Sequence, residues 1–245
     1  MFPKICTVGP FTIYSYGVML AIAVVVCSIL LGRDAKRMGL QAGTMYDLVF
    51  VAILSGIVGA RIFFILLNLS YFSKYPQEII MVQNGGLAFQ GGLVFATLAC
   101  VFFLKKKGIL SLEVADLIAP YLALGQSIGR IGCFLNGCCH GKHADHGMFF
   151  PVHDDHLHPT QLYATVGLLI VFFSLKKLQT MNLPKGKIFV YYLILASSLR
   201  FVIQSFRADN QAVFLGLSVY HCVAIIIFLI AIYVNYRIDR QRRQS

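Results

Sequence analysis

Residues 48–67 read LVFVAILSGIVGARIFFILL, an apolar run interrupted by a single charged side chain, Arg61. A helix rises about 1.5 Å per residue, so a run of about 20 residues crosses a hydrocarbon core of about 30 Å. A helix that is apolar on every side needs lipid or protein around it rather than water. This stretch therefore predicts a membrane-spanning helix.

The composition of the whole chain agrees with this prediction. Of 245 residues, 58% are hydrophobic and 13% are charged, and the mean hydropathy is +0.75. Soluble domains carry about 25% charged residues, so soluble, disordered, collagen-like and disulfide-rich classes are excluded. A net charge of +11 is also typical of nucleic-acid binding, but the basic residues alternate between loops instead of forming one patch. We expect a membrane protein with no nucleic-acid partner.

Apolar runs of similar length recur to the end of the chain, and no change in composition marks a second domain. We expect one transmembrane domain over residues 1–245, an all-α polytopic membrane protein with about seven transmembrane helices. The predicted spans are Ile13–Leu31, Leu48–Leu67, Leu87–Leu104, Val114–Leu135, Thr160–Leu175, Ile188–Phe206 and Val213–Tyr236. The third is the least regular, because Gln90-Gly91-Gly92 interrupts its start, and a re-entrant segment is the alternative there.

Basic residues set the predicted orientation. One set of alternate loops contains fourteen Lys and Arg residues, and the opposite set contains four. Cytoplasmic loops carry the excess of positive charge, which places the N-terminus outside and the C-terminus in the cytoplasm. No Ala-x-Ala cleavage site follows the first span, so we expect this span to remain in the mature protein.

Three arginines fall inside predicted spans: Arg61, Arg130 and Arg200. Counting about 1.5 Å per residue from the cytoplasmic ends puts all three about 18–24 Å into the membrane, in its outer half. An arginine at that depth costs several kcal/mol unless it meets partners or water. For a single arginine the alternative is snorkelling or pairing with backbone carbonyls, whereas three at one depth favour a shared site.

Other polar side chains fall in the same layer. Tyr16 and Gln90 lie a few residues from the outer surface, and Gln204 lies one turn beyond Arg200. No acidic residue falls at that depth, so the guanidinium groups need an anion from elsewhere, and the planar fork of arginine matches phosphate. We infer a site for a lipid phosphate that opens to the outer leaflet.

Residues 125–141 read GQSIGRIGCFLNGCCHG, a glycine-rich strip around Arg130 and Asn136. Glycines at these spacings let another backbone or a ligand approach closely. The pattern Gly129-Arg130-Ile131-Gly132-x-Phe134-x-Asn136-Gly137-x3-Gly141 resembles the signature of the bacterial prolipoprotein diacylglyceryl transferases. Further matching pieces in the family's order cover nearly the whole chain: Tyr16-Gly17, Gly59-Ala60-Arg61, Gly91-Gly92-Leu93, Ala115-Asp116, His158-Pro159-Thr160-Gln161-Leu162-Tyr163, Arg200-Phe201 and Phe206-Arg207.

This resemblance implies an enzyme of the bacterial inner membrane with its active site facing the outer leaflet. Such an enzyme transfers the diacylglyceryl group of phosphatidylglycerol to the lipobox cysteine of prolipoprotein signal peptides and releases glycerol phosphate, and no cofactor is expected. Catalytic roles are implied for Arg130, Arg200 and Gln90. Roles in binding phosphatidylglycerol are implied for Arg130, Tyr16, Arg61, Asn136, Gly141 and Gln204.

The chain departs from the family pattern at several positions. Gln90 stands in place of a histidine, Gln204 in place of an acidic residue, and Ala196 in place of a tyrosine. Cys133 and Cys138 stand in place of an asparagine and an acidic residue. Glutamine cannot act as a general base, so three alternatives follow: another group is the base, the cationic site alone suffices, or the chain is a paralogue with altered activity.

Cysteines and histidines crowd the segment between the fourth and fifth spans. The spacing from Cys133 to Cys138, Cys139 and His140 matches no established zinc pattern, so no metal is expected. A disulfide involving Cys138 or Cys139 is allowed on the oxidising side of the membrane. If a histidine is the base, His140 and His158 are the candidates closest to the outer edge.

A second class of function also fits the arginines: a polytopic protein that binds or transports an anionic lipid or a metal. Transporters often contain two related halves with paired broken helices. The sequence contains no convincing internal repeat, which favours the transferase.

Overall fold

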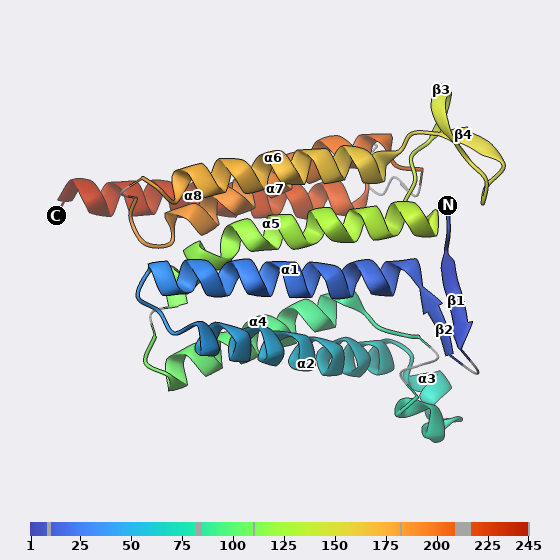
Figure 1. Ribbon diagram of the computed structural model, residues 1–245, viewed down its shortest axis with the longest axis horizontal. Helices are drawn as coiled ribbons and strands as arrows, with labels where there is room; N and C mark the ends of the chain where they lie inside the picture. The colour runs from blue at the N-terminus through green and yellow to red at the C-terminus, as the bar shows by residue number, and fades with distance from the viewer. Residues whose placement is uncertain (9–10, 82–84, 110, 182, 209–216, 245) are drawn as a thin grey trace. The chain divides into compact units, whose positions relative to one another are not determined.

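The computed structural model describes residues 1–8, 11–81, 85–109, 111–181, 183–208 and 217–244. In this part of the chain, Figure 1 shows long helices joined by short connections, together with small hairpins. The helices are α1 (Ser15–Arg37), α2 (Ala42–Leu67), α3 (Leu69–Phe72), α4 (Phe89–Lys106), α5 (Ser111–Asn136), α6 (Thr160–Leu178), α7 (Lys187–Phe206) and α8 (Val219–Gln244), with a 3₁₀ helix at Pro76–Ile79. The predicted start of the last span, residues 213–216, lies outside the described residues.

The chain divides into two compact units. Unit 1 contains Met1–Leu31 and Ala115–Ser245, and unit 2 contains Gly32–Val114. Helix α1 therefore begins in unit 1 and ends in unit 2, and α5 begins in unit 2 and ends in unit 1. The expectation of one domain over the whole chain stays a prediction.

The helices confirm an all-α polytopic membrane protein. Within the described residues, six helices are long and apolar enough to cross a bilayer, namely α1, α2, α4, α6, α7 and α8. Their outward faces carry large apolar side chains such as Phe50, Leu98 and Phe173, which are 65–66% exposed. Lipid is the solvent in which such faces are stable, because helices satisfy their own backbone hydrogen bonds.

Helix α5 coincides with the fourth predicted span but does not belong to those six apolar helices. It carries Glu113, Asp116 and Arg130, while its Leu117 and Ala119 are fully buried. Neighbouring helices shield such a helix, so its sequence contains more polar and small residues than a lipid-facing helix. The two chain termini lie at opposite ends of unit 1, as expected for an odd number of crossings (Figure 1). The number of crossings and the side of each terminus stay predictions.

The structure adds two short antiparallel hairpins that the sequence did not predict. β1 (Lys4–Val8) pairs with β2 (Phe11–Tyr14), and β3 (His143–Phe150) pairs with β4 (Asp155–Leu157). The first predicted span began at Ile13, but this residue belongs to β2. A short apolar run is ambiguous between strand and helix, so hydropathy alone assigned it to the span.

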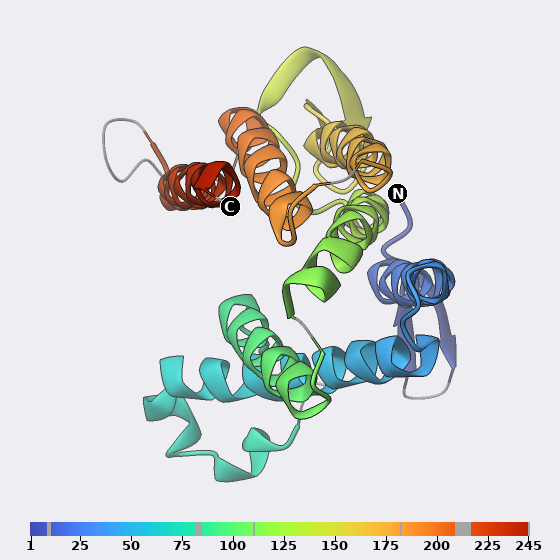
Figure 2. The same cartoon turned by 90° about the vertical axis from the view of Figure 1, so that its left-hand side faces the viewer.

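In unit 2, α2 and α4 pack backbone against backbone (Figure 2). A Cβ built on Gly91 would lie 2.2 Å from the Cβ of Phe63 and 2.5 Å from the carbonyl oxygen of Gly59. Only glycine lets the two helices approach this closely. Gln90-Gly91-Gly92 lies near the start of a continuous α4, so the re-entrant alternative is not observed.

In unit 1, Asp116 of α5 anchors the start of α7. Its carboxylate accepts hydrogen bonds from the backbone N–H groups of Gly186 (2.6 Å) and Phe189 (2.8 Å). A carboxylate at a helix N-terminus satisfies free N–H groups and complements the helix dipole. This contact fixes the position of α7 along α5. It therefore sets the relative positions of Arg130 on α5 and Arg200 on α7.

Candidate anion-binding site

One end of unit 1 collects most of the predicted site residues. Figure 1 shows α5 and α7 ending there, α1 and α6 beginning there, and the β3–β4 hairpin beside them. Arg130 and Arg200 each lie six residues before the last residue of their helices, Asn136 and Phe206. The two guanidinium groups are close enough to interact electrostatically. Arg207, the residue after α7, also interacts electrostatically with Arg200. The sequence put Arg130 and Arg200 at one depth, and the fold of unit 1 brings them together.

The described part of the protein does not neutralise the charges of Arg130 and Arg200. None of its carboxylates lies within ion-pair distance of either guanidinium group. The ring of Tyr220, at the start of α8, lies 5.4 Å from Cζ of Arg200 in a cation–π contact. Two neighbouring guanidinium groups that repel each other and lack a carboxylate partner indicate a site for an anion.

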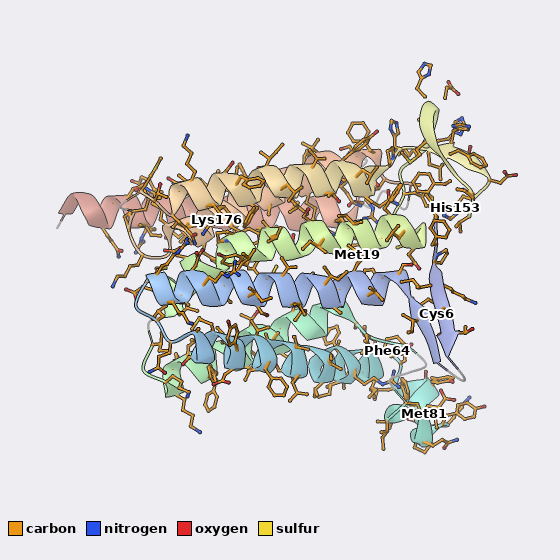
Figure 3. All side chains as sticks on the ribbon, in the orientation of Figure 1. Cys6, Met19, Phe64, Met81, His153 and Lys176 are labelled. Carbon is orange, nitrogen blue, oxygen red and sulfur yellow. The ribbon has the colours of Figure 1, made fainter. Side chains whose placement is uncertain are left out.

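Tyr16 reaches this end of unit 1 from the first turn of α1. A Cβ built on Gly132 of α5 would lie 3.0 Å from Cβ of Met19 and 3.2 Å from Cδ2 of Tyr16, so glycine lets α1 pack closely here (Met19 in Figure 3). Tyr16 is close enough to Arg130 for their charges to interact. A Cβ built on Gly129 would meet nothing within 4 Å, which leaves room beside Arg130 for a ligand.

Three cysteines meet at the end of α5. Gly137, with φ of +74°, ends the helix in a Schellman turn, in which its N–H donates to the carbonyl of Phe134 (3.1 Å) and the N–H of Cys138 donates to that of Cys133 (3.1 Å). The turn folds Cys138 back toward the helix. The sulfur atoms of Cys133, Cys138 and Cys139 therefore all lie within 4.8 Å of one another. All seven cysteines are free thiols.

Buried side chains at the start of α6 hold this cysteine loop. Thr160 Oγ1 donates a hydrogen bond to the carbonyl of Cys139 (2.8 Å), and Gln161 Nε2 donates one to the carbonyl of Cys138 (2.6 Å). Thr160 and Gln161 are 2% and 1% exposed. Cys139 has φ of +62°, a backbone conformation that is uncommon outside glycine. Contacts on both carbonyls fix the loop in this conformation.

The cysteine loop lies beside the arginines. Hydrogen bonds from the two neighbouring thiols hold the pKa of the Cys139 thiol well below its usual range, and the charges of Arg207 and Arg130 act in the same direction. The side chain of Asn136, the last residue of α5, is close enough to Cys138 to interact with its thiol. The predicted residue Asn136 therefore belongs to this end of unit 1 through the cysteine loop.

Gly141 joins three segments at the same end. Its N–H donates to the carbonyl of His158 (2.8 Å), and it pairs with Arg207 in an isolated β-bridge. A Cβ built here would lie 2.5 Å from Cβ of His158 and 2.7 Å from the carbonyl oxygen of Phe206, so only glycine fits. Gln204 of α7 is 2% exposed, and its carbonyl accepts a hydrogen bond from the N–H of Arg207 (3.2 Å). Both residues are placed to support the fold around the arginines.

Unit 2 gives Arg61 an environment different from the expected one. Its guanidinium group donates hydrogen bonds to five backbone carbonyls in the segment after α3, among them Ile79 (3.0 Å), Gly85 (2.7 Å) and Met81 (3.3 Å). The ring of Phe64 lies 5.9 Å from its Cζ (Phe64 and Met81 in Figure 3). Arg61 thus follows the alternative stated for a single arginine, pairing with backbone carbonyls, and not the shared anion site. The physical reason is that the connection after α3 folds over the end of α2.

The eight predicted site residues are divided between the units. Gln90, exposed near the start of α4, belongs to unit 2 together with Arg61. The other six belong to unit 1, namely Tyr16, Arg130, Asn136, Gly141, Arg200 and Gln204. The candidate anion site accordingly consists of residues of unit 1.

Three further residues at this end of unit 1 were not among the predicted site residues: Arg207, Thr160 and Gln161. Each falls in a piece that matched the family pattern, Phe206-Arg207 or the piece from His158 to Tyr163. That match was the available signal. Their contacts depend on where α7 ends and on which carbonyls α6 meets, and neither has a pattern in the sequence.

Comparison of the sequence with known proteins gives one family in each of the matches described below. The family profile described as prolipoprotein diacylglyceryl transferase matches residues 3–237. The phosphatidylglycerol–prolipoprotein diacylglyceryl transferase of Bacillus cereus (strain G9842) is 33% identical over 214 residues, which is 82% of this chain and 79% of that protein. Proteins of the same name from Bacillus mycoides (strain KBAB4) and Bacillus anthracis (strain CDC 684 / NRRL 3495) are 34% and 33% identical over the same coverage.

Proposed function

This chain belongs to the prolipoprotein diacylglyceryl transferase family, and on that basis we propose how unit 1 binds and activates phosphatidylglycerol. The protein is a membrane enzyme of lipoprotein maturation that transfers a diacylglyceryl group from phosphatidylglycerol to prolipoproteins. Arg130 and Arg200 bind the phosphate of the lipid headgroup. The observation that carries this assignment is the pair of neighbouring guanidinium groups with no carboxylate partner in the described residues.

The chemistry of the transfer matches such a site. A thiolate sulfur attacks the glycerol carbon that carries the phosphate, the carbon–oxygen bond breaks, and the electron pair leaves with glycerol phosphate. Negative charge on the phosphate therefore grows as the bond breaks. Arg130 and Arg200 repel each other when the site is empty, and that repulsion is offset most fully when the phosphate charge is largest. The pair stabilises the transition state more than the bound lipid, which is what accelerates the step.

Other residues of the site have supporting roles in this proposal. Tyr16 and Asn136 order the headgroup by hydrogen bonds. Gly141 and Gln204, which are both buried, hold the ends of α5 and α7 in place. Gln90, which is exposed near the start of α4, carries an amide that donates and accepts hydrogen bonds and does not act as a base.

We place the protein in the bacterial inner membrane with this end of unit 1 toward the outer leaflet. The support is the distribution of basic residues, fourteen in one set of alternate loops and four in the other. The acceptor in this arrangement is the lipobox cysteine of a prolipoprotein signal peptide, which reaches the site from the same leaflet as the lipid.

The test is transfer by the purified full-length chain in detergent, with phosphatidylglycerol and a lipobox peptide as substrates. We expect the peptide to gain the mass of one diacylglyceryl group, with one glycerol phosphate released for each peptide modified. A peptide with serine in place of the lipobox cysteine is the control and stays unmodified. A protein that remains folded and binds the lipid without modifying the cysteine peptide would contradict the proposal.

A further inference from the structure

The three thiols at the end of α5 are not part of the phosphate site. The sulfur atoms of Cys133, Cys138 and Cys139 lie within 4.8 Å of one another, and all three residues are partly buried. Among the residues that the structure describes, no further His, Cys, Asp or Glu belongs to this group. His140 follows in the sequence, but its ring packs against that of His153, with centroids 4.2 Å apart. The cluster therefore consists of three sulfur atoms and no other candidate ligand.

The distances suit one metal ion bound by three sulfur atoms. Zinc–sulfur bonds of about 2.3 Å in a tetrahedral site separate the ligand sulfurs by about 3.8 Å. Sulfur atoms already within 4.8 Å need to approach by about 1 Å at most, which rotation of the side chains supplies. Thiolate ligands select zinc and similar soft ions over Mg²⁺ and Ca²⁺.

The backbone that carries the cysteines is held in place by its surroundings. Thr160 and Gln161 bind the carbonyls of Cys139 and Cys138, and the Schellman turn at Gly137 fixes the approach of the loop to the helix. Metal sites need such contacts behind their ligands, because these contacts orient the ligands before the ion binds. The cluster is thus preorganised.

The charges around the cluster also suit a thiolate site. A divalent ion with three thiolates carries a net charge of −1, and a fourth thiolate makes it −2. Arg130 and Arg207 lie close enough to Cys139 for their charges to interact with it. Nearby cations offset this negative charge, which lowers the cost of holding the thiolates in a partly buried position.

We propose that Cys133, Cys138 and Cys139 bind one divalent ion of the zinc class, and that the open fourth position of this ion takes the thiolate of the acceptor cysteine. The second half of the proposal rests on the proposed function. A zinc site with three protein ligands keeps such an open position, and a thiol that coordinates the ion loses its proton. Next to Arg130, the site would supply the thiolate nucleophile that Gln90, which is not a base, cannot generate.

The step balances in atoms and electrons. The acceptor thiol coordinates the ion and releases its proton to water. Its sulfur then forms a bond to the glycerol carbon, the bond from that carbon to the phosphate oxygen breaks, and the electron pair leaves with glycerol phosphate, which Arg130 and Arg200 hold. The product is a thioether, a weaker ligand than a thiolate, so it leaves the fourth position.

The first measurement is the metal content of the full-length protein, purified under reducing conditions, stripped with a chelator and reloaded with Zn²⁺. We expect one zinc ion per chain. Cys133→Ser and Cys139→Ser lose the ion, and the control Cys222→Ser, at a partly buried cysteine of α8, retains it. Unfolding temperatures of the variants show whether they are folded. Absence of stoichiometric zinc in the wild type, or full zinc binding by Cys133→Ser and Cys139→Ser, would overturn the site.

The second measurement tests the fourth position, with Co²⁺ in place of Zn²⁺ as a spectroscopic probe. A lipobox peptide raises the sulfur-to-cobalt charge-transfer absorption by about one third, because three thiolate ligands become four, whereas the serine peptide leaves it unchanged. No rise with the cysteine peptide would overturn the proposed role of the ion in binding the acceptor.

Transfer activity separates this proposal from the proposed function. We expect the stripped protein to lose at least about tenfold in transfer rate and Zn²⁺ to restore it, because a neutral thiol is a poor nucleophile. Full transfer by the stripped protein overturns the role of the ion while the proposed function stands. Zinc binding and the cobalt response without any transfer support the metal site and contradict the proposed function.

Discussion

Arg61 and Arg130 show that the depth of an arginine in a predicted span does not define its role. Both fall in apolar runs within two residues of a glycine, and both are costly in lipid if left without partners. Arg61 is 8% exposed and donates to five backbone carbonyls, whereas Arg130 has no carboxylate partner in the described residues. Every residue has a carbonyl, so no sequence pattern marks the partners of Arg61. The absence of an acidic residue near Arg130, in contrast, was visible in the sequence.

Removal of the Arg61 guanidinium is predicted to destabilise unit 2. Hydrogen bonds to a charged group contribute about 1.5–3 kcal/mol each, and the carbonyls left behind recover part of this by binding water, so Arg61→Ala is expected to cost about 2–4 kcal/mol. The measurement is thermal unfolding in detergent. The control is Arg237→Ala on α8, where an exposed arginine contacts the ring of Tyr233 and the change is expected to be within about 0.5 kcal/mol. Equal unfolding temperatures for the two variants would contradict a structural role for Arg61.

The β3–β4 hairpin is predicted to depend on pH through His143. Its Nδ1 lies 2.7 Å from Oδ1 of Asp155, which raises the pKa of His143 above 6.5 and lowers that of Asp155 below 3.8. The contribution of charged His143 to the stability of the hairpin is complete below pH 6.5 and is lost as the pH rises through the raised pKa of His143. The contribution of charged Asp155 to the stability of the hairpin is complete above pH 3.8 and is lost as the pH falls through the lowered pKa of Asp155. The hairpin is therefore most stable between these two values.

Hydrogen exchange of the β3 amides across this pH range measures the effect, corrected for the intrinsic exchange rate. His143→Gln is the matched variant, and it is expected to remove the pH dependence of β3 amide exchange above pH 6.5. A His143 that titrates at or below 6.5 in the intact protein would contradict the ion pair.

At the scale of elements, the sequence predicted the long helices well and the hairpins not at all. An apolar run of about 20 residues has one stable form in lipid, so hydropathy locates each such helix directly. β1 and β2 are 5 and 4 residues long. In such short segments, neither the periodicity of the apolar residues nor the segment length distinguishes a strand from the start of a helix. The meeting of the three cysteines depends on the Schellman turn at Gly137, and a contact made by a turn is not visible as a spacing pattern.

The packing of α2 on α4 is predicted to fail when Gly91 gains a side chain. In Gly91→Ala the new Cβ would lie 2.2 Å from Cβ of Phe63, and the helices must separate along their contact. We expect a cost of about 1–3 kcal/mol, measured by thermal unfolding. The control is Gly43→Ala in α2, where a Cβ meets nothing within 4 Å and the better helix propensity of alanine makes the change neutral or stabilising. Equal effects of the two changes would show that the close approach is unimportant.

In the whole molecule, the class of protein and the shared depth of Arg130 and Arg200 could be predicted from the sequence more fully than the architecture around them. Arg130 and Arg200 could be predicted because charge without a counter-ion in a membrane span is conspicuous. The division of the chain into two units, with Arg61 and Gln90 in one and the other site residues in the other, has no signal in composition. Both units have the same apolar composition, so nothing in the sequence marks a boundary between them.

The orientation of the molecule is predicted from its basic loops. Fusion reporters are expected to place Lys106, Lys177 and Arg240 in the cytoplasm and Lys74 and Lys142 outside. Accessibility of single introduced cysteines to a membrane-impermeant reagent gives the same information without a fusion. A C-terminus found outside would contradict the predicted orientation and, with it, the position of the arginines in the outer half of the membrane.

In the proposed function, Arg130 and Arg200 stabilise the phosphate charge that grows during transfer. The most direct test of this role is the rate of glycerol phosphate release by Arg130→Ala and Arg200→Ala, compared with the remote control Arg237→Ala in the same assay. We expect losses of about 100- to 1,000-fold for the first two and no loss for the control. Arg130→Lys is expected to remain impaired, because a point charge does not replace bidentate contact with phosphate. A folded Arg130→Ala protein that transfers at the wild-type rate would contradict the role of Arg130 in stabilising the phosphate charge.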